Sequence, residues 1–308
     1  MTRVSTFGNY QSALLDLMAA QISQQDAQER VSTRKNATDL TGFGRGAETL
    51  TAMKGAQNRL QGFLDTGDAV AARLQAQDLA LTQMVDAITG AREAIAGALA
   101  ADSNTVLMLD LQGHFQSIQN GLNTRHQGGY LFAGANTNTP PVNVGSLAEL
   151  AAAPDVASVF TNDQLKPASR IAEATSVETG FLADALGADV FQILRDIQAY
   201  HSGPNGPLSG KPNDTQKAFL TAQLSRLDAV RIEVTDAASR NGSLQNRIDS
   251  VTAAHVEQMN ALDALVSKRT DADMARAVTD LQLSQIAVQA SAQVVSQLSQ
   301  VSLLNYLR

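Results

Sequence analysis

The chain has no cysteine and no tryptophan, and aromatic residues make up only 4% of it. The absence of cysteine excludes disulfide bonds and thiolate metal sites. The scarcity of bulky aromatic side chains argues against a large compact core. Alanine, glutamine, leucine and serine are abundant instead, and a chain rich in them suits long helices packed side by side.

Long apolar runs and basic segments are missing as well. No window approaches the roughly 20 apolar residues that cross a bilayer. The start "MTRVSTFGNYQSALLDLMAAQ" lacks the basic and then apolar pattern of a cleaved signal peptide, so any export is expected to use another route. The net charge is −7 without a long basic stretch, so we expect neither nucleic acid nor a membrane as a partner.

Proline is confined to one part of the chain. All seven prolines lie between residues 140 and 212, and the flanking regions contain none. Because proline breaks helix interiors, the flanks are free to be helical and the middle is not. The sequence therefore predicts a mainly α protein. Its two arms form a long antiparallel coiled coil or helix bundle built from both termini, around a small β-rich or α+β insert at 136–212.

Apolar residues recur at steps of three and four along both arms, the spacing of coiled-coil seams. The first row runs from Leu50 to Leu99 and includes Asp78; the second runs from Leu220 to Leu265 and includes Asn241 and His255. Polar residues within a seam are expected to set the register of the helices. The pattern predicts breaks at Ala101–Asn104 and within "KRTDADMARAVTD".

These breaks predict three domains. Residues 1–45 and 274–308 would form terminal helices. Residues 46–135 and 213–273 would form a helical bundle, and 136–212 an insert.

A search for reactive groups finds little. The four histidines are far apart, and His255 in a seam is expected to be packed and hydrogen-bonded. The stretch "GFGRGA" (Gly42 to Ala47) fits a dinucleotide fingerprint but follows a polar stretch rather than a strand, so we interpret it as a loop between helices. Asp271 and Asp273 are expected to cap the last helix. We predict no catalytic residue, no cofactor and no metal, and therefore no enzyme.

The two ends of the chain carry an excess of apolar residues. Leu14, Leu15, Leu17, Met18 and Ile22 begin an amphipathic helix, and the end "QVVSQLSQVSLLNYLR" is apolar at about half of its last eleven positions. Ordering each residue costs about 1–2 kcal/mol, while burying a large apolar side chain returns about 1.5–3 kcal/mol. Only burial on nearly all sides stabilises such a tip, so we expect many copies to pack around an axis and the terminal helices to order on assembly. The predicted assembly contacts are Leu14, Leu17, Met18, Ile22, Leu298, Val301, Leu303, Leu304, Tyr306 and Leu307.

Several short motifs resemble the bacterial flagellin family, most closely its hook–filament junction proteins, the third hook-associated proteins. "RVST" at Arg3 to Thr6 is similar to the "RIST"-like start of the family, and "VSTRK" at Val31 to Lys35 to its "ISTGK"-like turn. "GGYLFAGANTNTPPV" from Gly128 to Val142 resembles an element of the junction proteins, and "VSLLNYL" the family ending "SLFDYL". Arg34 stands where the family usually has glycine.

The resemblance implies a structural subunit of the bacterial flagellum that joins hook to filament. It implies export through the flagellar type III apparatus and extracellular assembly in the flagellum. It also implies that the terminal helices, 1–45 and 274–308, form an inner assembly coiled coil that lines a hollow tube, and that the insert, 136–212, faces outward. The implied partners are copies of the same chain in a helical or ring assembly, the hook-side junction protein, flagellin and an export chaperone.

Three alternatives remain open. A filament flagellin would form long filaments by itself, although the Gly128 to Val142 segment argues against it. A coiled-coil tethering or signalling protein would not depend on its extreme termini. An enzyme seated in residues 136–212 would have a single histidine, His201, at its disposal.

Overall fold

The computed structural model describes the backbone of residues 2–306 and the side chains of residues 8–300. The chain divides into two compact units: residues up to 60 together with those from 257 onwards, and residues 61–256. Helices dominate both units, and the described strands form two small antiparallel sheets. The predicted fold class, mainly α with a small β-containing insert, is confirmed. The three-domain division stays a prediction.

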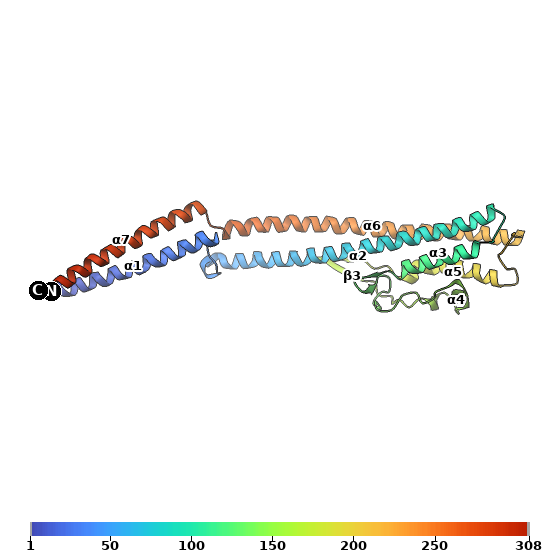
Figure 1. Cartoon of the computed structure of the whole chain (residues 1–308), viewed down its shortest axis with the longest axis horizontal. Coiled ribbons are helices and arrows are strands. Elements are labelled where there is room, and N and C mark those ends of the chain that lie inside the picture. The colour runs from blue at the N-terminus through green and yellow to red at the C-terminus, as the bar shows by residue number, and fades with distance from the viewer. Residues whose placement is uncertain (1, 307–308) are drawn as a thin grey trace. The chain divides into compact units, whose positions relative to one another are not determined.

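The first unit is built from the two ends of the chain. Helix α1 (Thr2–Thr33) lies beside α7 (Met274–Tyr306), and their outer ends carry the N- and C-termini (Figure 1). The pair is therefore antiparallel. The unit also contains the beginning of α2 (Ala47–Ala100), the end of α6 (Asp214–Thr270) and the 3-10 turn η1 (Thr41–Gly46).

The second unit contains the remainder of α2 and α6 together with the shorter elements. Its helices are α3 (Leu107–Leu122), α4 (Leu147–Ala152) and α5 (Ala183–Ser202), with a 3-10 turn η2 (Ala157–Val159). Strand β1 (Arg125–His126) pairs with β2 (Gly129–Tyr130), and β3 (Ala168–Ala172) pairs with β4 (Thr175–Glu178). No described helix combines the length and the apolar character needed to cross a membrane.

Both predicted helix breaks are confirmed. Helix α2 ends at Ala100 and α3 begins at Leu107, while α6 ends at Thr270 and α7 begins at Met274. At the first break Asp102 has a left-handed backbone with φ 53°. Its carboxylate forms ion pairs with Lys217 at 2.6 Å and Lys211 at 3.0 Å, and these contacts lower its pKa. The ion pairs connect the turn to the beginning of α6.

The core of the second unit centres on three phenylalanines. Phe191 of α5 lies with its ring centroid 5.2 Å from Phe115 of α3 and 5.4 Å from Phe160. Phe115 and Phe191 are fully buried. Phe160 and Phe191 both come from the stretch 136–212, so this stretch contributes to the same core as α2 and α3.

The β3–β4 hairpin packs on the long helices within this unit. Ile171 and Val177 of the hairpin form a second apolar cluster with Val70, Leu74 and Ile248. The carbonyl oxygen of Ile171 lies 2.9 Å from Nε2 of His255, whose ring stacks on Phe63 at 5.5 Å. His255 is therefore packed and hydrogen-bonded, as predicted.

The predicted seam of α6 is buried or half-buried from Leu220 to His255, but Gln258 and Leu265 beyond it are exposed. On α2 the predicted row is correct at Leu74 and Leu81 and wrong at Asp78. Asn241 is fully buried and donates to the carbonyl of Leu74 at 2.9 Å. On α2, however, Gln77 is buried and donates to the Thr179 carbonyl at 3.0 Å, whereas Asp78 is exposed. A row of three- and four-residue steps can be drawn along adjacent faces of one helix, and burying a neutral amide costs less than burying a carboxylate.

The segment from Gly128 to Val142 forms a tight buried connection. Leu131, Phe132 and Ala133 are buried, and the Phe132 carbonyl accepts a hydrogen bond from the backbone of Ala183 at 3.0 Å. Gly134 has φ 67°, and a Cβ there would overlap the carbonyl oxygen of Asp163. Only glycine fits this position.

Candidate assembly interface

Helices α1 and α7 meet along a seam with heptad spacing. The residues of α1 that are buried or half-buried at the seam follow one another at alternating steps of three and four, as do those of α7. On α1 they are Tyr10, Ala13, Leu17, Ala20, Gln24, Ala27 and Val31. On α7 they are Ala277, Leu281, Ser284, Val288, Ser291, Val295 and Leu298. Alternate positions carry alanine or serine, which brings the two helices close together.

The opposite side of α1 is apolar as well. Leu15, Met18 and Ile22 are exposed to 65%, 57% and 60%. At 3.6 residues per turn they lie on one face, about 160° around the helix from the seam residues. A surface helix normally places charged and polar residues on that face.

Helix α7 carries a matching set. Leu283 and Ile286 are each exposed to 61% and lie on the side of the helix turned away from the seam. Val294 is exposed to 49% and lies on the flank of the helix, about 90° from the seam. Each helix of the α1–α7 pair, which we call the terminal hairpin, therefore has two apolar faces. The contact between the two helices buries one of them. We call these six residues the outer stripe.

The structure divides the assembly contacts predicted from sequence. Leu14, Leu17 and Leu298 are half-buried, and Leu17 and Leu298 belong to the seam within the chain. Met18 and Ile22 are exposed in the outer stripe. Val301, Leu303, Leu304 and Tyr306 continue α7, but their side chains lie outside the described part, and Leu307 lies outside the described residues. None of these positions is shown to contact another copy.

Sequence reasoning missed four outer-stripe residues as assembly contacts. Leu15 lies on the same face as the chosen Met18 and Ile22, and Leu283, Ile286 and Val294 lie outside the seam of α7. The signal was available, because a helix with two apolar rows at different angles requires two partners. The contact between α1 and α7 provides a partner for one row only.

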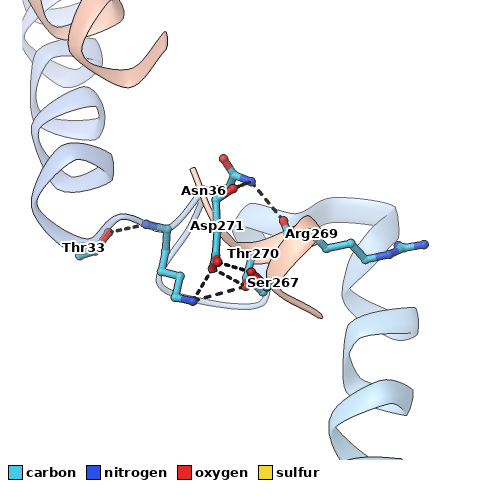
Figure 2. A network of polar contacts seen from close by, with 7 residues as sticks. Thr33, Asn36, Ser267, Arg269, Thr270 and Asp271 are labelled. Carbon is cyan, nitrogen blue, oxygen red and sulfur yellow. Dashed lines mark hydrogen bonds and ion pairs between the residues drawn. The ribbon is translucent and has the colours of Figure 1, made fainter. Parts of the chain in front are cut away.

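A network of polar contacts joins the loop after α1 to the residues before α7, at the inner end of the terminal hairpin (Figure 2). The backbones of Lys35 and Asp271 pair as an antiparallel bridge. The Asn36 amide nitrogen donates to the Thr270 carbonyl at 2.7 Å, and that of Ala272 to the Arg34 carbonyl at 2.9 Å. The Asn36 side chain also donates to the carbonyls of Arg269 at 3.1 Å and Asp271 at 3.0 Å.

A charge pair completes the network. The Lys35 ammonium group donates to Oδ1 of Asp271 at 2.5 Å, and the Ser267 hydroxyl donates to Oδ2. These contacts, with that to Lys35 the largest, lower the pKa of Asp271 from 3.8 to about 2. The carboxylate stays charged over nearly the whole pH range in which proteins are handled.

The two aspartates therefore have different roles. Asp273 accepts from the backbone of Ala275 at 3.0 Å and of Arg276 at 3.3 Å, so the predicted cap of α7 is confirmed. Asp271 does not cap α7, and that prediction is wrong. Its side chain is held by Lys35 on the opposite loop, a partner 236 residues away that helix-cap spacing cannot reveal.

The glycine-rich stretch is a connector, as predicted. Residues 41–46 form the η1 turn, and Gly44 within it has φ 50°. The Asp39 side chain accepts from the backbone of Gly42 at 2.9 Å, which fixes the entry to the turn and contributes to a lowered pKa for Asp39. In the described part of the chain, no three histidine, aspartate or glutamate side chains gather closely enough to hold a metal ion.

Comparisons with known proteins agree with this geometry. Residues 224–307 match the family model described as the bacterial flagellin C-terminal helical region. The C-terminal arm of the chain therefore resembles the C-terminal helical region of bacterial flagellin. The match covers all but the first ten residues of α6 and the whole of α7, and it supports the resemblance inferred from the motif at the C-terminal end.

Two solved structures share the fold of this chain. A protein assigned as a flagellar hook-associated protein from Vibrio parahaemolyticus superimposes with a TM-score of 0.61 at 16% identity, over 75% of this chain and 100% of that one. Bacillus cereus FlgL gives a TM-score of 0.53 at 15% identity, over 71% and 98% of the two chains. No curated protein sequence matches the chain.

Proposed function

We propose that this flagellin-like chain is a structural subunit of the bacterial flagellum. It joins hook to filament and polymerises through its terminal helices. The family match at its C-terminal arm and its fold, shared with a hook-associated protein and with FlgL, support this assignment.

The observation that carries the proposal is the outer stripe. Six large apolar side chains remain exposed on a two-helix hairpin whose other faces already meet along the seam. Burying each of them fully would contribute about 1.5–3 kcal/mol. Neighbouring copies arranged around an axis would cover this surface on both helices.

The seam suits the hairpin to such packing. Ala13, Ala20 and Ala27 face a side of α7 that carries Ala277 and Ser284, so the pair is thin. Thin helix pairs pack at high density around a central axis, with many apolar neighbours for each subunit. The terminal helices would then form the innermost layer of the assembly.

The remaining parts of the proposal follow the resemblance. The chain would be exported through the flagellar apparatus without a cleaved signal peptide, with the help of a chaperone, and would act outside the cell. Its partners would be copies of itself, a hook-side junction protein and flagellin. It would work as a non-catalytic building block.

A filament flagellin is the second candidate. The matching family model describes the C-terminal region of flagellin itself, and that region is the one with the outer stripe of α7. The two candidates differ in what the purified chain builds alone. A junction protein forms short assemblies on hook ends, whereas a flagellin forms long filaments.

The experiment compares the full chain with a version that ends before Gln297. Circular dichroism of each monomer measures helix content, and electron microscopy follows each protein after mixing with hook fragments. We expect nearly equal helix content and capped hook ends only with the full chain. Long filaments from the full chain alone would favour flagellin, and a full chain that neither caps hook ends nor forms filaments would contradict both candidates.

A further inference from the structure

A cavity lies in the second unit, residues 61–256, where the β1–β2 turn meets α2. This cavity has a volume of about 570 Å³. Its walls come from the middle of α2, the β1–β2 turn, the segment that follows it and β3. The residues that bear on its chemistry are Thr66, Arg73, His126, Tyr130, Thr137 and Ser169.

The cavity is cationic in an acidic protein. Arg73 and His126 line it, and none of the described residues lining it is aspartate or glutamate, although the chain has a net charge of −7. A cavity of about 560 Å³ in the same unit provides a contrast. There, Lys166 and Arg240 are accompanied by Glu178, Asp189 and Glu233.

Arg73 forms no ion pair with a carboxylate of the described residues. Its Nη2 donates to the neutral carbonyl of Leu131 at 3.1 Å, and its Nε is buried without a protein acceptor among the described residues. Burial lowers the pKa of the guanidinium group. A partly buried cation held only by a neutral acceptor is destabilising until an anion compensates it.

The adjoining turn adds further positive charge and donors. Nε2 of His126 is buried without a protein hydrogen-bond partner among the described residues. The guanidinium group of Arg125 lies 4.8 Å above the Tyr130 ring and donates to the Gly128 carbonyl at 3.2 Å. Hydroxyl groups of Thr66, Thr137 and Ser169 belong to the same walls.

We infer that this cavity binds an oxyanion, a carboxylate or a phosphate group, through Arg73 and His126. A guanidinium group presents its donors in a planar fork that matches both groups. The hydroxyl groups of Thr137 and Ser169 supply further donors, whereas that of Thr66 donates to the Gly62 carbonyl within α2. The inference rests on the cavity alone and does not depend on the assembly role.

The test is an NMR titration of the full chain with sodium phosphate and, separately, with sodium acetate, at ionic strength held constant with sodium chloride. We expect saturable shifts of the Arg73 Nε–H signal and of the Gly128 and Gly129 amides. Arg73→Gln should weaken binding at least tenfold and His126→Asn several-fold. Arg240→Gln is the matched control, because that arginine lies in the cavity that has its own carboxylates, and it should bind like the native chain.

A dilution series without added anion shows whether the anionic group that binds in the cavity comes from a second copy of the chain or from a free ion. Shifts of the same amides with protein concentration would identify a carboxylate of a second copy, and their absence would identify a free ion. Equal affinity in the native chain and in folded Arg73→Gln or His126→Asn would overturn the inference. Shifts that grow linearly without saturation would overturn it as well.

Discussion

The ammonium group of Lys35 donates a hydrogen bond of 2.5 Å to the carboxylate of Asp271, which lies 236 residues further along the chain. The two residues also pair through their backbones. Two loops, one after α1 and one before α7, are thereby joined at the point where both terminal helices begin to run together. The pair fixes the inner end of the hairpin that carries the outer stripe.

The first prediction concerns the charge state of Asp271. Its folded pKa of about 2 lies below the ordinary 3.8. Since the pKa is depressed on folding, the stabilisation by this pair is complete above about pH 4 and is lost as the pH falls through 2. Carbon-detected NMR of the side-chain carboxyl should give a pKa near 2 in the native chain.

Two variants separate the causes of this shift. Lys35→Met removes the largest cause and should raise the Asp271 pKa towards its ordinary value, whereas Ser267→Ala removes the second and should raise it less. A larger rise in Ser267→Ala, or an ordinary pKa in the native chain, would contradict the described pairing.

The second prediction concerns Arg34, which has a left-handed backbone with φ 58°. This conformation costs a residue with a Cβ about 1–2 kcal/mol, and glycine adopts it freely at the expense of greater freedom when unfolded. We expect Arg34→Gly to stabilise the protein by about 0.5–1 kcal/mol in denaturant unfolding. Arg45→Gly, at an exposed position with ordinary φ, should destabilise it, and a loss of stability in both variants would refute the strain at Arg34.

The third prediction separates backbone strain from steric clash. Gly134 and Gly210 have similar φ values of 67° and 64°, but a Cβ at Gly134 would overlap the Asp163 carbonyl while one at Gly210 would meet nothing within 4 Å. Both alanine variants should lose about 1–2 kcal/mol from strain. Gly134→Ala should lose clearly more, and thermal unfolding measures the difference. Equal losses would mean that the segment shifts to accept the methyl group.

The fourth prediction concerns the aromatic core. Phe191 is fully buried between Phe115 and Phe160, so Phe191→Ala should cost about 3–5 kcal/mol. Leu109→Ala on α3 provides the control, because Leu109 is 75% exposed and its loss should change stability by less than about 0.5 kcal/mol. Urea unfolding followed by circular dichroism gives both values, and a small effect of Phe191→Ala would show that this core is loosely packed.

The helices could be predicted because they depend on local signals. Proline is confined to residues 140–212, and the long helices α2 and α6 lie on either side of that stretch. The spacing correctly predicted that Asn241 and His255 lie on the buried face of α6. These features require only the period of the helix and the steric effect of proline.

What could not be predicted depends on partners that are distant in sequence. Gln77 rather than Asp78 is buried because the Thr179 carbonyl, after the β3–β4 hairpin, provides its acceptor. Asp271 differs from Asp273 because Lys35 comes within reach only in the folded hairpin. The outer stripe was predicted only in part. The spacing shows that each terminal helix has two apolar faces, but it does not show which face is buried within the chain.

The assembly account depends on the apolar character of three exposed residues of α1. Leu15→Gln, Met18→Gln and Ile22→Gln, combined in one chain, remove that character from the outer stripe of α1. The substitutions leave the seam with α7 untouched, because the seam lies on the opposite side of the helix. The helix should therefore keep its place in the hairpin, since glutamine has a good helix propensity.

The control makes the same number of changes to glutamine on a neighbouring exposed face of α1. It combines Ser12→Gln, Asp16→Gln and Ser23→Gln, at positions about 100° around the helix from the outer stripe. All three positions are exposed and polar in the native chain, so these changes remove no apolar surface. Any effect of added glutamine side chains in general would appear in this variant too.

The most direct measurement counts by electron microscopy the hook ends that each protein caps, after circular dichroism has shown equal helix content. The account predicts that the outer-stripe variant stays helical but no longer caps hooks, while the control caps them as the native chain does. Native capping by the outer-stripe variant would contradict the claim that the outer stripe is the assembly surface.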